Sequence, residues 1–178
     1  MIEQELQERI RRAVSEGRKS RSAYYAEIVL ADEQELGEPA PEVELGELEA
    51  RLGRPLPPSY RMFLSLHNGW RMASGAIDLL PVKEMLQGPR EARIREWQTQ
   101  ASAVGDSVAA ESLVIGYSEF TSTKLLLDPA RADAEGEWTV VGHDKAEEWT
   151  CPSFLQWLDE SAIEFRELFE EEKTGRSA

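Results

Sequence analysis

Cysteine is almost missing from this sequence, because Cys151 is the only one among 178 residues. A disulfide within the chain is therefore excluded. Long apolar runs are missing too, since no stretch approaches the ~20 apolar residues that a membrane-spanning helix needs. The first residues, MIEQELQERIRRAVSEG, are charged throughout and lack the apolar centre of a signal peptide. These absences predict a cytoplasmic protein that does not bind membranes.

The patterns that carry common chemistries are missing as well. The sequence contains no phosphate-binding loop, no dinucleotide-binding glycine pattern and no nucleophile elbow. The two histidines, His67 and His143, stand far from each other and from Cys151, so no zinc-ligand spacing is present. His67 falls on the apolar face of a predicted helix, which favours a packed histidine over a base. We therefore predict no catalytic residue, no metal site and no cofactor, and an enzyme is the least favoured class.

Basic residues are scarce relative to acidic ones, with 20 Lys and Arg against 34 Asp and Glu, for a net charge of −14. A charge of this sign repels nucleic acid and anionic membranes and attracts a basic protein. Solubility alone also explains an acidic chain, and that alternative stays open. The acidic residues gather in one block between Arg21 and Arg51, which has no Lys or Arg and nine carboxylates: Glu27, Asp32, Glu33, Glu35, Glu38, Glu42, Glu44, Glu47 and Glu49.

The N-terminal third is predicted to be helical. Apolar residues at helical spacing predict one helix over residues 2–16 that stops at Gly17, and a second over 23–36, before the break at 37–41. A third helix is predicted over 41–52, with Gly53 as its left-handed cap. A fourth begins at Pro58 and ends at Asn68 and Gly69.

The remaining sequence indicates strands followed by a long helix. Apolar runs at Leu113–Ile115 and Leu125–Leu127 predict a hairpin, and a further strand is centred on Val140. A helix is predicted over 90–104, and the clearest one is opened by Pro152. Gathered strands of this kind predict an α+β fold with a mainly antiparallel sheet flanked by helices. We divide the chain into a helical acidic N-terminal arm, one α+β domain and a flexible tail, at 1–41, 42–170 and 171–178.

The third and fourth helices could be read as a DNA-binding pair, because a short turn joins them. The second helix of that pair carries Arg61 as its only basic residue, and the net charge opposes binding. We therefore predict no binding to nucleic acid.

The same stretch resembles the opening motif of the SUKH superfamily, and within it the family named for a yeast regulator of cell-wall and glucan synthesis. The matching residues are Glu49, Leu52, Gly53, Leu56, Pro57, Ser59, Tyr60, Phe63, Leu64, Asn68 and Gly69. The segments IDLLPVKEM, LVIGYSEFTSTKLLLD and SFLQWL resemble later family elements, so the similarity runs from about Glu42 to Asp159. Two residues depart from the pattern, Ser122 in the hairpin loop and Trp70 after Asn–Gly, where the family usually has glycine.

The resemblance implies a single non-catalytic SUKH-like domain. Bacterial members of the superfamily are often immunity proteins that neutralise toxins, many of them basic nucleases, and an acidic inhibitor would be steered toward such a toxin. A regulatory or scaffold domain that binds a housekeeping protein is the alternative, and the oligomeric state stays open. We assign structural roles to Leu52, Gly53, Leu56, Pro57, Tyr60, Phe63, Asn68 and Gly69. The candidate partner-binding residues are Glu33, Glu35, Glu42, Glu44, Trp70, Tyr117, Glu119 and Trp149.

Overall fold

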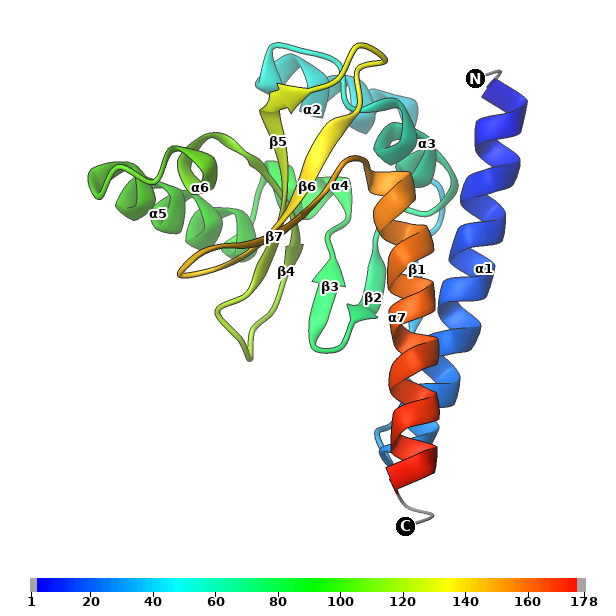
Figure 1. The fold of residues 1–178 in the computed structure, drawn as a ribbon. Helices are drawn as coiled ribbons and strands as arrows, with labels where there is room; N and C mark the ends of the chain where they lie inside the picture. The colour runs from blue at the N-terminus through cyan, green and yellow to red at the C-terminus, as the bar shows by residue number, and fades with distance from the viewer. Residues whose placement is uncertain (1–2, 176–178) are drawn as a thin grey trace.

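The computed structural model describes residues 3–175, which form seven helices and one seven-stranded sheet (Figure 1). The helices are α1 (Glu3–Glu27), α2 (Glu42–Leu52), α3 (Pro58–Leu66), α4 (Val82–Leu86), α5 (Pro89–Ala103), α6 (Ser107–Glu111) and α7 (Phe154–Gly175). The strands are β1 (Glu35–Leu36), β2 (Trp70–Ser74), β3 (Ile77–Leu79), β4 (Leu113–Tyr117), β5 (Lys124–Ala132), β6 (Trp138–Asp144) and β7 (Ala146–Cys151).

The strands lie in the sheet in the same order as in the sequence, and every neighbouring pair is antiparallel. This arrangement confirms the predicted α+β fold. The predicted hairpin is β4 and β5, in which Leu113 pairs with Leu127. Three strands were not predicted, the inner strand β2 and the two edge strands, β1 and β7. β1 is only two residues long, and β7 is exposed at every position except Cys151, so neither has the alternating apolar pattern of a half-buried strand.

The first helix differs from its prediction. α1 runs without a break from Glu3 to Glu27, so the predicted stop at Gly17 is wrong, as is the predicted helix over 23–36. Gly17 serves close packing instead. A Cβ atom there would lie 2.8 Å from Arg21 Nη1 and 3.2 Å from the Trp70 ring. A side chain at this position would collide with Arg21 and Trp70, so only glycine fits there.

The long helices α1 and α7 lie side by side and run in the same direction along one side of the sheet (Figure 1). Tyr24 and Tyr25 of α1 make edge-to-face contacts with the Phe165 ring of α7, at centroid distances of 5.7 and 5.8 Å. α7 continues to Gly175, past the predicted start of the tail, and residues 176–178 lie outside the described range.

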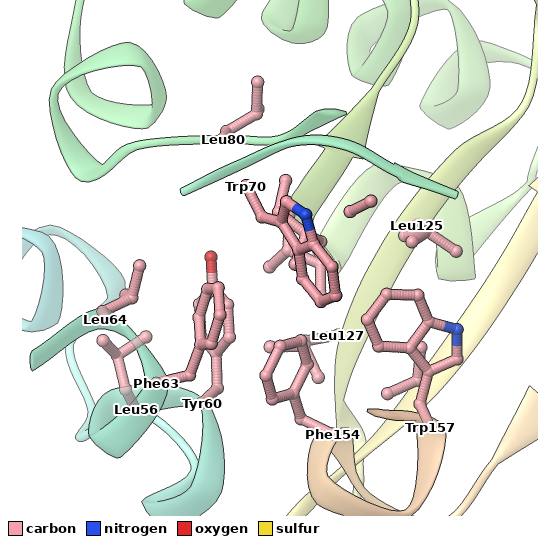
Figure 2. Close-up of a cluster of buried hydrophobic side chains, with 14 of the residues drawn as sticks. Leu56, Tyr60, Phe63, Leu64, Trp70, Leu80, Leu125, Leu127, Phe154 and Trp157 are labelled. Atoms are coloured by element: carbon pink, nitrogen blue, oxygen red, sulfur yellow. The ribbon is translucent and has the colours of Figure 1, made fainter. Parts of the chain in front are cut away.

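The opening motif forms the predicted helix–loop–helix, α2 and α3. Gly53 ends α2 at a φ of 67°, and Pro58 occupies the first turn of α3, so both predictions are confirmed. Tyr60 and Phe63 of α3 are fully buried against the Phe154 ring, at centroid distances of 4.9 and 5.1 Å (Figure 2). The motif therefore fills the core between α3, α7 and the sheet.

Most of the polar motif residues close the turns around this core. Glu49 Oε1 accepts hydrogen bonds from Leu56 N, at 3.0 Å, and from Arg61 Nε, at 3.2 Å. Asn68 Oδ1 accepts one from Val82 N, at 2.7 Å, and so satisfies a free amide at the start of α4. Two motif residues flank the loop. Leu52 is half-buried, and Pro57 is buried.

We expect any replacement of Gly69, even by alanine, to lower the stability of the fold. Its φ is 95°, and a Cβ would lie 2.9 Å from the Leu79 carbonyl oxygen and 3.0 Å from Pro81 N. We expect Gly69→Ala to lower the free energy of unfolding by about 1–3 kcal/mol in urea melts. Gly46→Ala is the matched control, because Gly46 lies inside α2 with open space around it, and it should stabilise by roughly 0.5–1 kcal/mol. Equal effects of both changes would contradict this account.

Candidate partner-binding groove

A groove of about 870 Å³ lies over β2 and β3. Successive side chains of a strand point to opposite faces, and the Trp70 ring turns toward Arg21 of α1, so Arg71 turns to the other face. The groove lies on that other face, away from α1 and α7. Its walls come from residues 30–37, the starts of α4 and α5, and the loop between β4 and β5.

The groove contains more carboxylates than cations, because Arg71 and Arg90 face Glu33, Glu35, Asp78, Glu84 and Glu119. The guanidinium of Arg90 lies at the centre, with Glu84 at 2.9 Å, Asp78 at 3.3 Å and Glu119 at 3.4 Å. Burial alone would lower the pKa of Arg90, but these carboxylates raise it above its usual value. Three of the five carboxylates are thus held in place by one charged arginine.

A large apolar side chain stands at the rim of the groove. Phe120 is 88% exposed, although the loop that carries it is well held. The hydroxyl of the buried Ser118 accepts hydrogen bonds from Phe120 N and Thr121 N, at 3.0 and 3.1 Å. Leu30 adds a second exposed apolar group on the opposite wall. An aromatic ring exposed on a fixed loop is a typical anchor for a protein partner.

The backbone is strained on the same side of the molecule. Val29, next to Leu30, has a φ of 57°, and Met72 in the lining has a φ of 54°. Both values are unfavourable for residues other than glycine. The Tyr25 hydroxyl holds this region together by donating to the Met72 carbonyl at 3.0 Å and accepting from Gly75 N at 3.1 Å. Strain of this kind is concentrated at functional sites in proteins.

The structure brings together three of the predicted partner-binding residues. Glu33, Glu35 and Glu119 all line the groove, although they come from two distant segments. Tyr117 lies next to it and is half-buried, with its ring 6.0 Å from the guanidinium of Arg90. Phe120 and Arg90 were missed by the sequence reasoning. A lone phenylalanine in the polar loop SEFTST was the available signal for the former, and Arg90 had none.

Trp70 was predicted as a candidate partner-binding residue, but its side chain is only 1% exposed, so its ring packs inside the protein. The guanidinium of Arg21 in α1 lies over the Trp70 ring, 4.6 Å from its centroid. Figure 2 shows the ring among the buried apolar side chains of the core. Trp70 also borders the groove, although almost none of its surface is exposed.

The other predicted residues lie apart from the groove. Glu42 and Glu44 occupy the first turn of α2, where carboxylates favour the positive end of the helix dipole, and Glu42 pairs with Arg61. Trp149 lies in edge strand β7 opposite Gly142, and a Cβ on Gly142 would clash with its ring. The ring therefore covers the glycine and remains 41% exposed.

The residues considered for chemistry have structural partners. Burial raises the pKa of Cys151 to about 12, so its thiol stays protonated at neutral pH. His143 is buried and its Nε2 lies 2.8 Å from Asp106 Oδ2. Within the described part of the chain, no three His, Cys, Asp or Glu side chains gather closely enough to hold a metal ion. Among residues 3–175, no helix combines the length and apolar character needed to cross a membrane.

The fold and the groove define an α+β domain whose sheet presents an open acidic face. Residues 39–160 match the SMI1 / KNR4 family (SUKH-1), and because this range covers most of the chain, the protein belongs to that family. The resemblance seen in the sequence is confirmed. Membership is consistent with an immunity-type or a regulatory domain. None of the curated proteins is similar enough to this chain to match it.

Proposed function

We propose that this protein is a non-catalytic immunity protein that uses the groove to bind and neutralise a basic toxin. The observation that carries the proposal is the placement of Phe120 beside Glu33, Glu35 and Glu119. An apolar anchor surrounded by fixed carboxylates suits a partner segment that has both an apolar side chain and Lys or Arg residues.

The carboxylates favour a protein over a nucleic acid as the partner. A nuclease toxin carries basic residues to hold phosphate, so the net charge of −14 would steer the two proteins together. Neutralisation by binding needs no chemistry from the inhibitor. The family also supports a regulatory role, in which the same groove would bind a housekeeping protein.

Capture of partners from the cells that make this protein tests the proposal. The bait is compared with Phe120→Ser/Glu35→Gln, which changes the groove, and with Val104→Ser/Glu135→Gln. The second pair removes an apolar group of similar exposure and a carboxylate, and neither residue lines the groove. We expect the wild type and the control to retain one basic protein, identified by mass spectrometry as a toxin, and the groove variant to lose it.

Three other results would count against parts of the proposal. Equal capture by all three baits would place the contact outside the groove. A housekeeping protein lost with the groove variant would favour the regulatory role. Loss with the control variant alone would place the contact at Val104 or Glu135, outside the groove.

A further inference from the structure

A second cleft, of about 530 Å³, lies between α1 and the end of α3. Its lining combines two apolar residues, Val14 of α1 and Leu36 of β1, with Ser15, Ser22 and the basic residues Arg11, Arg18, Lys19 and His67. Leu36 follows Glu35 in β1, so the two side chains point to opposite faces. The cleft is therefore separate from the acidic groove that Glu35 lines.

Three cations of this cleft form no salt bridge within the described residues. Other arginines of the chain form ion pairs, for example Arg71 with Glu33, but none is formed by Arg11, Arg18 or Lys19 in that range. Asp32 is the carboxylate that interacts electrostatically with Arg18, and its oxygens already accept hydrogen bonds from the Ser22 hydroxyl and Gln34 N. Three side-chain cations gathered in this way are unexpected in a chain with a net charge of −14.

The positive charges of the cleft affect the pKa of His67. Its ring is half-buried and lies 6.1 Å from the Phe63 ring. Burial lowers its pKa, and the charges of Arg11 and Arg18 lower it further. The imidazole thus lies in the field of two guanidinium groups. A bound anion would supply the missing negative charge.

We infer that this cleft binds a phosphate monoester. A monoester carries nearly two negative charges and three acceptor oxygens. Two guanidinium groups, an ammonium and an imidazole match such a dianion better than a single carboxylate, which one arginine would satisfy. The apolar side chains of Val14 and Leu36 suit contact with the organic part of the ester. This binding goes beyond the proposed function, because it uses a different face and a different ligand.

The experiment is an NMR titration of the two histidine rings at constant ionic strength. Phenyl phosphate is the probe, inorganic phosphate shows whether the organic group matters, and acetate supplies a monoanion. We expect phenyl phosphate to raise the pKa of His67, because a facing dianion stabilises the imidazolium. The ring of His143, paired with Asp106, is the internal control and should not respond.

Charge variants decide whether the cleft itself binds. Arg11→Gln/Arg18→Gln should weaken binding at least about tenfold, since the variant loses the charge-assisted hydrogen bonds of two guanidinium groups to the phosphate. The same variant should raise the pKa of ligand-free His67. Lys145→Gln/Arg166→Gln removes the same charge elsewhere on the surface and should bind like the wild type. An unmoved His67, an equal response to acetate, or equal losses in both variants would each overturn the inference. A stronger response to inorganic phosphate than to phenyl phosphate would overturn the assignment of a monoester.

Discussion

Phe63→Ala is expected to lower the free energy of unfolding by about 3–5 kcal/mol, the usual cost of emptying a large aromatic site in a core. Phe63 has no exposed surface, and its ring packs against Tyr60, at a centroid distance of 6.3 Å, and Phe154, at 5.1 Å. The loss is a large fraction of the 5–15 kcal/mol that typically stabilises a domain. Urea melts of the variant and the wild type measure it.

The control for this change is Val43→Ala on the neighbouring helix α2. Val43 is 76% exposed, so its truncation should change stability by no more than about 0.5 kcal/mol. The urea midpoint of Phe63→Ala should therefore lie well below that of Val43→Ala. If both midpoints lay equally close to the wild-type midpoint, the motif helix would not pack as described.

Arg21→Ala is expected to cost about 2–4 kcal/mol, because the side chain links three elements of the fold. Its guanidinium lies between the rings of Trp70 and Phe165, at 4.6 and 4.5 Å. It donates to the Ala73 carbonyl of β2 and, at 2.9 Å, to the Ser161 hydroxyl of α7. Burial lowers its pKa to about 10, so it remains charged at neutral pH and its desolvation opposes these gains.

Arg21→Met separates packing from polar contacts. Methionine restores much of the volume between the two rings but leaves the Ala73 carbonyl without the guanidinium, so we expect about half of the alanine loss. Replacing a buried charge by an apolar group sometimes stabilises a protein. A methionine variant more stable than the wild type would mean that desolvation of Arg21 outweighs its hydrogen bonds and cation–π contacts. Urea melts of both variants distinguish the two outcomes.

Local patterns predicted the elements that depend on local physics. The helix pair contains its own stop and start signals, Gly53 at the end of α2 and Pro58 at the start of α3. The β4–β5 hairpin shows two apolar runs around a polar turn. Gly17 misled the prediction because glycine also marks close packing, and its neighbour Trp70 is 53 residues away in the sequence. Trp70 itself follows Asn–Gly, so the sequence placed it at a corner but could not show which way the ring turns.

The groove was predictable only in its parts. The acidic block pointed to Glu33 and Glu35, and the hairpin loop to Glu119, but only the sheet order places those segments on opposite walls. The central role of Arg90 depends on Asp78, Glu84 and Glu119 meeting in space. No spacing in the sequence indicates that these four side chains lie in contact.

The central claim is that the partner binds in the groove, with Phe120 as its anchor. The most direct test is the dissociation rate of the captured partner, measured by surface plasmon resonance for Phe120→Ala and for Trp149→Ala. Both are exposed aromatic residues, but Trp149 lies on the edge strand β7 and does not line the groove. We predict that Phe120→Ala speeds dissociation at least about tenfold, as expected for a hot spot, and that Trp149→Ala changes it less than about threefold. The reverse result would contradict the account and place the partner on β7.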